Sequence, residues 1–264
     1  MCSAKLAEVS LVFNYGDASP ESCVSSSQLI ELESLSGDSF QYNFFNENTG
    51  FGKGHNLLAQ AASSEYLLVI NPDIIVNDIF FNEMLDAFAH NPLCGIAEAR
   101  QIPLEHPKSY NQKTGETEWS SGACMMIPTR LFSEIGGFDW KSFWMYCEDV
   151  DISWRVRSRG SQTIYRPRAT ALHPKKLNRT GIIIASDTEC YYSAYSGLML
   201  AYKWNNPARL QKLKRIFAKS DDPYQSAALR QFEEAERNHE LPEQIRNANV
   251  AKFYPDGNYA KHRF

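Results

Sequence analysis

The sequence predicts an α/β fold, with a mostly parallel central sheet and helices on both of its faces. Residues 65–70 form a mostly apolar run of strand length, the pattern of a strand buried on both faces of a parallel sheet. Strand-like and helix-like segments follow one another on either side of this run. With 264 residues, 43% hydrophobic and 22% charged, the chain can bury a substantial core in one large domain or two small ones.

Composition narrows the class of protein further. A net charge of -4 argues against a general nucleic-acid binder, and no nucleic-acid partner is expected. The six cysteines are scattered without a C-x-x-C pair, which favours reduced thiols over a disulfide framework or a zinc site. The first residues lack the apolar run of a signal peptide, and no apolar stretch approaches the ~20 residues that span a bilayer. We therefore expect a cytoplasmic protein, with any membrane contact peripheral and at the inner face.

The expected elements follow the chain in a regular order. Strands are expected at residues 8–15, 40–45, 65–70, 95–100, 119–128 and 162–165. Helices are expected at residues 28–35, 57–63, 77–90, 129–135 and 187–204, with one or two more within 221–245. Residues 101–118 are polar and contain two prolines, and we expect a mobile loop over the site. We assign residues 1–180 to the α/β domain and residues 181–264 to a helical C-terminal extension packed on it.

Residues 143–160 carry the most informative pattern. The alternation of apolar residues from Val150 to Val156 would by itself indicate a strand. Acids gather at the start of the segment and arginines at its end, however, which matches the dipole of a helix, and Gly160 suits the residue that ends one. We predict a helix with Glu148 and Asp149 in its first turn. There a carboxylate can face a cleft and act as a general base, or the acids can simply cap a surface helix.

A glycine-rich segment at residues 46–56 precedes the helix expected from Leu57. Its three glycines alternate along the chain, which allows a tight turn and a close approach of the backbone to a ligand. The amides of the following helix could then face an anion. The alternative is a plain turn between a strand and a helix.

An Asn-Pro-Asp sequence follows the buried strand at residues 65–70. Ligands of open α/β sheets bind at the carboxyl ends of strands, so Asn71 and Asp73 are placed for a divalent ion such as Mg²⁺ or Mn²⁺. The alternative is a turn in which the Asp side chain bonds to its own backbone.

A run of basic residues in the C-terminal part could lie on an anionic membrane or form a solvated helix surface. It comprises Lys203, Arg209, Lys212, Lys214, Arg215 and Lys219.

Four of these segments together resemble the family 2 inverting glycosyltransferases, in particular the bacterial rhamnosyltransferase-like branch. They are residues 46–56, 67–73, 121–139 and 145–160, and the similar region runs from about residue 8 to 175. Each motif alone is weak, but all four in this order and spacing are specific. The resemblance implies a GT-A fold, which is a Rossmann-like nucleotide-sugar domain.

The resemblance also implies roles for individual residues. Asp73 matches the metal-binding acid of the family's D-x-D motif, Asn71 replaces its first Asp, and His173 is a candidate third ligand. Asp149 matches the general base and Glu148 its neighbour. The expected donor contacts are Asn14, Asp17, Asn48, Gly50, Gly52, Asn71 and Asp73. The expected acceptor contacts are Trp119, Ser121, Gly122 and Trp144.

The implied function is the metal-dependent, inverting transfer of one sugar in cell-surface polysaccharide synthesis. The donor would be a dTDP-, UDP- or GDP-sugar and the acceptor a glycan or lipid-linked hydroxyl. The Gln-x-x-Arg-Trp motif of processive synthases is absent, which favours a single addition. About 45 residues precede the Gly-Phe-Gly motif, so the chain departs from the family at a shortened N-terminus. This departure keeps a second hypothesis open, a degenerate GT-A domain that binds a glycan or a partner without catalysis.

Overall fold

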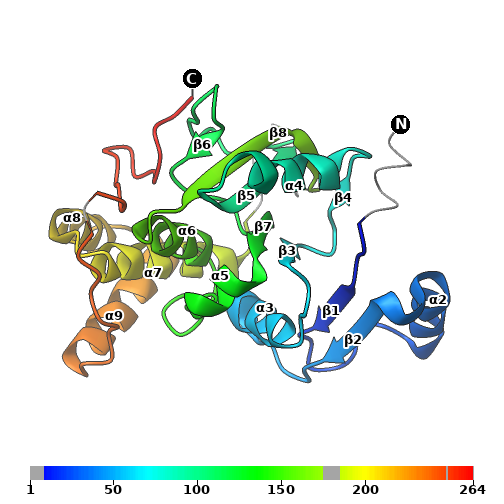
Figure 1. Ribbon diagram of the computed structural model, residues 1–264. Coiled ribbons are helices and arrows are strands. Elements are labelled where there is room, and N and C mark those ends of the chain that lie inside the picture. Colours follow the sequence, from blue (N-terminus) through cyan, green and yellow to red (C-terminus); the bar gives the residue numbers. More distant parts are fainter. Residues whose placement is uncertain (1–8, 175–184, 248, 264) are drawn as a thin grey trace.

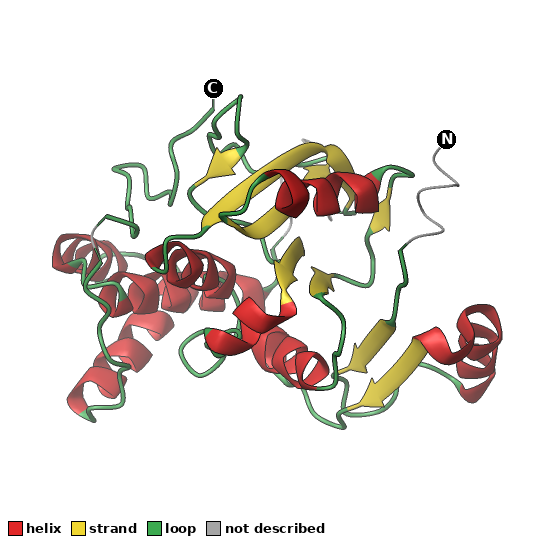
Figure 2. Cartoon of the chain, in the orientation of Figure 1, coloured by secondary structure: helices red, strands yellow, loops and turns green. Residues whose placement is uncertain are grey.

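A six-stranded mixed sheet forms the centre of the protein in the computed structural model, which describes residues 9–174, 185–247 and 249–263 (Figures 1 and 2). Its strand order is β3 (Tyr66–Ile70), β7 (Cys124–Pro128), β5 (Cys94–Ile102), β8 (Gln162–Leu172) and β4 (Ile75–Val76), and β6 (Glu116–Thr117) pairs with β8. The α/β prediction is confirmed. The expectation of a mostly parallel sheet is wrong, because only β5 and β8 pair in parallel in this sheet.

The antiparallel course of β7 decides which ends of the strands meet. Ile70 at the end of β3 lies opposite Cys124 at the start of β7, and Ile102 at the end of β5 lies opposite Leu172 at the end of β8. The ends of β3, β5 and β8 therefore share an edge of the sheet with the starts of β7 and β4. The residues that follow β3 and β8, and those that precede β7, converge there.

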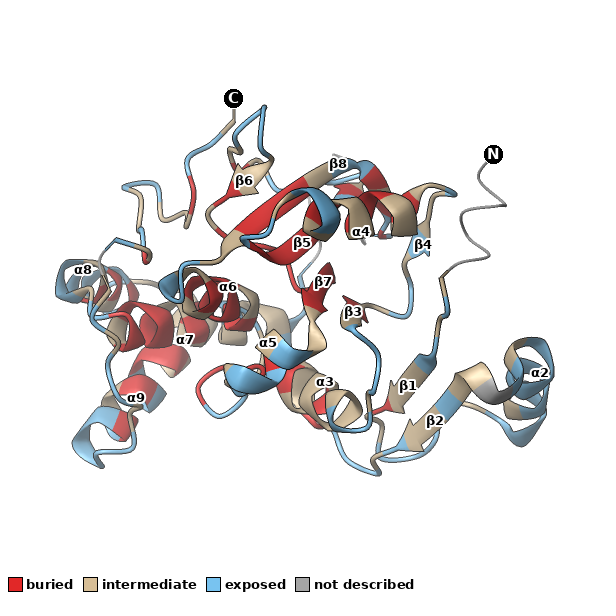
Figure 3. Ribbon diagram, viewed as in Figure 1, coloured by how far each residue is buried: buried red, intermediate tan, exposed pale blue. Residues whose placement is uncertain are grey.

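Helices cover both faces of the sheet, as predicted. On one face, α4 (Phe80–His90) buries Phe80 and Met84 against β5, β7 and β8. On the other face lie α3 (Gly50–Gln60), α5 (Thr129–Glu134) and α6 (Glu148–Ser158). There Phe138, Ile152 and Val156 pack with Ile96 of β5 in a second core. Figure 3 shows that burial is concentrated in the central strands and in α6 and α7.

A small parallel pair of strands stands apart from the main sheet. It consists of β1 (Phe13–Asp17) and β2 (Phe40–Phe44), joined by α2 (Ser26–Ser36) and the short 3-10 helix Gly37–Ser39. None of the described residues of α2 is buried, although Ser25 and Gln28 form a capping box at its start. Figure 1 shows this unit on the opposite side of the molecule from the C-terminal helices.

The C-terminal extension is helical, as predicted, with α7 (Asp187–Lys203), α8 (Pro207–Phe217) and α9 (Pro223–Arg237). Its predicted boundary, residues 180 and 181, lies outside the described residues. Beyond α9 the chain returns to the α/β domain, where Ser109 N–H donates to the Lys261 carbonyl at 2.6 Å and Arg263 pairs with Glu105 at 3.1 Å. The described helices include none with the length and apolar character needed to cross a bilayer.

The predicted basic run does not form one exposed surface. Lys203 is only 5% exposed and bonds to Asp139 at 2.8 Å and to Asp151 at 2.6 Å. Lys214 of the next helix pairs with Glu236 of α9 at 2.7 Å. Lys203 thus stabilises the packing of α7 against α6. A basic surface would have to be formed by the remaining residues of the run.

Two local predictions are also corrected. The glycine motif is not a loop before a helix: α3 begins at Gly50, and Gly52 and Gly54 are buried inside it. Residues 101–118 are not a free loop, because they contain β6 and the buried Lys108. In both cases interactions with distant residues, which sequence periodicity does not report, fix the backbone.

Candidate active site

The shared edge of the sheet gathers the predicted metal ligands. Asn71 follows β3, Gln101 lies at the end of β5, and His173 follows β8. The backbone there is tied to the start of β7, because Asn71 N–H donates to the Ala123 carbonyl at 3.0 Å. Residues 120–123, which lead into β7, thus form a wall beside the three strand ends.

Asn71, Asp73 and His173 lie close together, as the resemblance implied. His173 Nε2 lies 3.4 Å from Asn71 Nδ2 and 3.7 Å from Asp73 Oδ1. The ring is buried, and its Nδ1 lies 3.0 Å from Gln101 Oε1. The ring edge that carries Nε2 therefore faces the Asn-Pro-Asp segment.

These side chains fit a divalent cation by their chemistry. Ligand atoms about 2.1 Å from an ion such as Mg²⁺ lie about 3 Å apart at right angles, so the observed separations need only small adjustments. The nitrogen and oxygen of an Asn amide are assigned from hydrogen bonding, and a flip would turn Asn71 Oδ1 toward the site. No group of three His, Cys, Asp or Glu side chains with metal-binding spacing occurs among the residues that the structure describes, so the candidate set depends on the Asn71 amide.

Asp149 lies in the first turn of α6 and is fixed by two backbone amides. Gly122 N–H donates to Asp149 Oδ2 at 3.0 Å, and Val150 N–H donates to Oδ1 at 2.8 Å. A methyl group at position 122 would lie 3.2 Å from the Asp149 Cβ and from the Phe51 ring. The close approach of residue 122 to the carboxylate therefore favours glycine at this position.

The residues just before α6 adopt left-handed backbone conformations. Tyr146 and Cys147 have φ angles of 67° and 63°, in a region that costs non-glycine residues of order 1–3 kcal/mol each. Three contacts hold them: Ser196 Oγ donates to the Met145 carbonyl at 2.7 Å, the Tyr146 hydroxyl donates to Glu189 at 2.9 Å, and Cys147 Sγ lies 3.4 Å from the Tyr259 hydroxyl. The C-terminal extension thus helps to set the direction in which α6 begins.

The two neighbouring acids of α6 have different electrostatic environments. Burial and the adjacent Asp149 carboxylate raise the pKa of Glu148 well above its ordinary value. Burial also raises the pKa of Asp149, but the Gly122 and Val150 amides and the Lys108 ammonium oppose the shift. Among the described residues, none donates a hydrogen bond to the buried Glu148 Oε2. Negative charge is therefore better stabilised on Asp149 than on Glu148.

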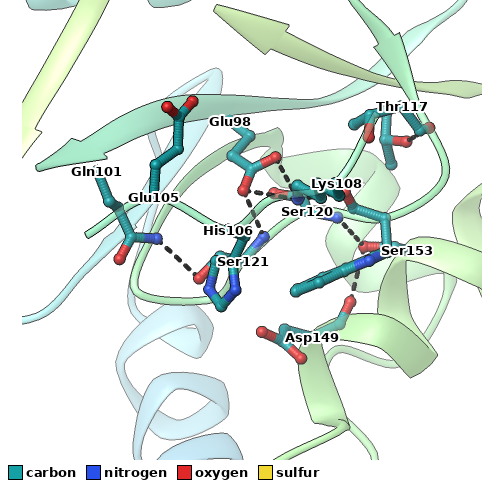
Figure 4. Close-up of polar contacts among 12 residues, drawn as sticks. Glu98, Gln101, Glu105, His106, Lys108, Thr117, Ser120, Ser121, Asp149 and Ser153 are labelled. Carbon is teal, nitrogen blue, oxygen red and sulfur yellow. Dashed lines mark hydrogen bonds and ion pairs between the residues drawn. The ribbon is translucent and has the colours of Figure 1, made fainter. Parts of the chain in front are cut away.

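A buried ion pair lies beside the same wall (Figure 4). Lys108 Nζ lies 2.6 Å from Glu98 Oε2, donates to the Trp119 carbonyl at 2.6 Å, and sits 3.9 Å from the centre of the Trp119 ring. Glu98 Oε1 in turn accepts a hydrogen bond from Ser121 N–H at 3.0 Å. This pair fixes residues 119–121, which position Gly122 against Asp149.

A chain of hydrogen bonds joins the two halves of the site. Gln101 Nε2 donates to Ser121 Oγ at 2.8 Å (Figure 4). The Oε1 atom of the same side chain lies 3.0 Å from His173 Nδ1. Ser121 directly precedes Gly122, whose amide binds Asp149. Two of the candidate metal ligands, Asn71 and His173, and the candidate base are therefore attached to one hydrogen-bonded framework.

The predicted donor residues other than Asn71 and Asp73 are spread over two further regions. Gly50 lies against Trp144, since a Cβ there would lie 2.8 Å from Trp144 Nε1, and Gly52 is buried against Phe138. Asn48 Oδ1 accepts a hydrogen bond from Gly50 N–H at 3.1 Å at the start of α3. These contacts favour a packing role for the glycines, which bring α3 against the segment before α6.

Asn14 and Asp17 belong to the separate β1–β2 unit. Burial would raise the pKa of Asp17, but hydrogen bonds from Ser19, Tyr42 and Cys23 outweigh it and hold the pKa well below its ordinary value. The carboxylate of Asp17 thus organises its own loop. The buried Asn14 Oδ1 accepts no hydrogen bond from any residue that the structure describes.

Two of the predicted acceptor contacts are aromatic residues with different placements. The Trp119 side chain is 9% exposed and packs with Phe143 and Trp154 in a core, which favours a structural role. Trp144 is half-buried and stacks on Tyr192 of α7 at 4.5 Å between ring centres. Trp144 is therefore the better candidate for an acceptor contact.

The sequence reasoning missed Gln101, Lys108 and Glu98. It ended the strand at Arg100 and placed Gln101 in the following loop, whereas β5 continues to Ile102. The rule that ligands gather at strand ends would have pointed to Gln101 had the strand been extended by two residues. No pattern in the sequence pairs Lys108 with Glu98, because that pair forms only when residues 103–119 fold back over β5.

Comparisons with known proteins concern the family resemblance and the fold. No protein-family model matches the chain. It is 40% identical over 146 residues to N-acetylglucosaminyl-diphospho-decaprenol L-rhamnosyltransferase of Mycobacterium tuberculosis, covering 42% of this chain and 47% of the relative. It is 24% identical over 160 residues to rhamnosyltransferase WbbL of Escherichia coli strain K12, covering 47% and 60%. The chain spans about half the length of the curated relatives it matches.

Solved structures share the fold at low sequence identity. GalNAc-T7 with UDP, GalNAc and Mn²⁺ matches with a TM-score of 0.58 and 12% identity, over 83% of this chain and 47% of that one. The mannosyltransferase PcManGT from Pyrobaculum calidifontis with GDP-Man and Mn²⁺ matches with a TM-score of 0.51 and 12% identity, over 86% and 71%. The GT-A fold and the resemblance to rhamnosyltransferases are therefore confirmed.

Proposed function

We propose that this rhamnosyltransferase homologue catalyses the inverting transfer of a single sugar from a nucleotide-diphosphate sugar to a hydroxyl group. The observation that carries the proposal is the framework that joins Asn71 and His173 to Asp149, with Asp73 lying 3.7 Å from the His173 ring. It supplies the two things that such a transfer needs on either side of a sugar, a place for the diphosphate and a proton acceptor. The relative's name suggests a lipid-linked acceptor and rhamnose as the transferred sugar.

We assign the diphosphate side of the site to Asn71, Asp73 and His173. A divalent cation bound by these side chains would neutralise the charge that grows on the leaving diphosphate. Oxygen ligands suit both Mg²⁺ and Mn²⁺, and the imidazole nitrogen favours Mn²⁺. Both structural neighbours named above were solved with Mn²⁺.

We assign the acceptor side to Asp149. Its carboxylate takes the proton from the acceptor hydroxyl while that oxygen forms a bond to the anomeric carbon and the carbon–diphosphate bond breaks. One displacement inverts the configuration at this carbon. The Gly122 and Val150 amides hold the carboxylate in one orientation, so the proton acceptor is positioned before the substrate arrives.

Nucleotide binding tests the proposal against a degenerate, non-catalytic GT-A domain. Calorimetry with UDP, GDP and dTDP, with and without Mn²⁺, should detect one nucleotide whose binding requires the metal. Asp73→Ala should remove the metal dependence, whereas Asp78→Ala on the same connection outside the ligand set should not. If none of the nucleotides binds at millimolar concentration, the chain is a non-catalytic binding domain and the proposal of an enzyme is rejected.

A further inference from the structure

The Gln101 side chain occupies a buried position between the two halves of the proposed site. Gln101, Ser121 and His173 are 4%, 4% and 5% exposed, so water does not compete strongly for their hydrogen bonds. Nε2 of the Gln101 amide donates to Ser121 Oγ at 2.8 Å, and Oε1 lies 3.0 Å from His173 Nδ1. An amide has one donor end and one acceptor end, which suits it to two different partners.

The contact with His173 selects one tautomer of the imidazole. A carbonyl oxygen accepts hydrogen bonds only, so Gln101 Oε1 requires a proton on His173 Nδ1. The lone pair of the neutral ring then resides on Nε2, the nitrogen that faces Asn71 and Asp73. A second residue that fixes the tautomer of a ligating histidine is a general feature of metal sites.

The contact with Ser121 acts on the opposite side of the site. Ser121 is held at two atoms, by Gln101 at Oγ and by Glu98 at the backbone N–H. The next backbone amide, that of Gly122, binds Asp149 Oδ2 at 3.0 Å. A shift of Ser121 would therefore move the group that orients the carboxylate.

We infer that Gln101 is a positioning residue that fixes the Nδ1–H tautomer of His173 and, through Ser121, the place of the Gly122 amide on Asp149. The inference rests on the proposed function for its catalytic meaning, because His173 and Asp149 have roles only in that reaction. A merely structural Gln101 would contribute to stability without selecting a tautomer.

The first test is ¹⁵N NMR of the full chain with labelled histidine, without added metal. His173 should carry its proton on Nδ1 in the wild type. Gln101→Leu should move the proton to Nε2 or give a mixture, and Gln101→Glu, which keeps an oxygen facing Nδ1, should retain the wild-type tautomer. Gln162→Leu is the matched control, since Gln162 is a hydrogen-bonded glutamine at the other end of β8. A wild-type proton on Nε2, or an unchanged tautomer in Gln101→Leu, would overturn the inference.

The second test measures Mn²⁺ binding by electron paramagnetic resonance. Gln101→Leu should weaken the Mn²⁺ affinity by about 10–100-fold, the range found when a residue supporting a metal ligand is lost. Gln162→Leu should leave it unchanged. Equal affinities in the wild type and Gln101→Leu would contradict the positioning role.

The two tests separate the inference from the function on which it rests. If the wild type binds no Mn²⁺, the proposed metal site fails, but the NMR experiment still decides whether Gln101 sets the tautomer. If Gln101→Leu does not fold, the spectra of the wild type and of Gln101→Glu still show which ring nitrogen of His173 carries the proton. Loss of the Nδ1–H tautomer in Gln101→Glu would also contradict the inference.

Discussion

Asp149 combines a half-buried position with three groups that favour its charged form. Burial raises its pKa, and the amides of Gly122 and Val150 and the ammonium of Lys108 limit the rise. The sequence correctly predicted that Asp149 lies in the first turn of a helix, because the acids and arginines of this segment indicate a helix and its direction. It gave no information on Lys108, whose approach depends on the folding of a segment more than 30 residues earlier in the chain.

The raised pKa leads to a pH dependence of transfer. A general base must be ionised, so kcat/KM falls as pH falls through the pKa of Asp149. Because that pKa is raised, the acidic limb should lie above about pH 4, the value of an ordinary aspartate. A rate profile measured with a nucleotide sugar checks this. A profile that stays flat down to pH ~4 would exclude Asp149 as the base.

The Lys108–Glu98 pair should be important for stability because both charges are buried. Lys108→Met leaves Glu98 buried without its cation and should lower the free energy of unfolding by about 3–5 kcal/mol. The matched control is Lys53→Met, which breaks a partly exposed pair with Glu47 and should change the free energy of unfolding by about 0–1 kcal/mol. Urea titrations measure both. Equal effects would show that the buried pair does not support the wall of the site.

Helix α3 was predicted as a helix, but its start was predicted seven residues too late. The sequence expected a helix from Leu57, because glycines usually interrupt helices. The structure starts it at Gly50, and Gly52 allows α3 to approach Phe138 and Trp140. The benefit of this contact outweighs the low helix propensity of glycine, but it depends on residues more than 80 positions away.

Substitution of two helical glycines tests this explanation. A Cβ at Gly52 would lie 3.0 Å from the Phe138 Cβ and 3.3 Å from the Trp140 Cβ, so Gly52→Ala should destabilise the protein by about 1–3 kcal/mol. Gly197 lies in α7 with nothing within 4 Å of its would-be Cβ. Gly197→Ala should therefore stabilise the protein by about 0.5–1 kcal/mol. Thermal unfolding with both variants distinguishes packing from propensity, and a neutral Gly52→Ala would reject the packing argument.

The whole molecule unites the α/β domain and the helical extension through a buried cluster of charges. Asp151 of α6 is fully buried and contacts Arg155 at 2.7 Å, Lys203 of α7 at 2.6 Å and Trp204 Nε1 at 3.0 Å. Apolar residues of both parts surround this cluster in a common core. The extension thus supports the start of α6, where Asp149 lies.

Loss of Lys203 should destabilise the α/β domain and the helical extension together. Lys203→Met leaves Asp139 and Asp151 without a shared cation and should lower the unfolding free energy by about 3–5 kcal/mol. Lys212→Met on the surface of α8 should change it by less than about 0.5 kcal/mol. Unfolding followed by near- and far-UV circular dichroism should remain a single transition. Two separated transitions in the wild type would contradict the common core.

The overall topology shows where sequence reasoning reaches its limit. Apolar runs and charge patterns were sufficient to predict an α/β fold with a helical extension, and the GT-A type was implied by the resemblance to family 2 glycosyltransferases. They did not predict the antiparallel direction of β7, because periodicity reports burial and not strand direction. The same limit applies to the joining of Asn71 to the wall at Ala123, which follows from that direction.

In the proposed reaction, the Asn71–Asp73–His173 group and Asp149 act on one sugar from two sides. An NMR assay of transfer from a nucleotide sugar with Mn²⁺, which follows the anomeric configuration of the product, tests this claim most directly. The wild type should give product of inverted configuration, and Asp149→Asn should still bind the donor but lose about 10²–10⁴-fold in rate. Product of retained configuration, or a wild-type rate in Asp149→Asn, would contradict the claim.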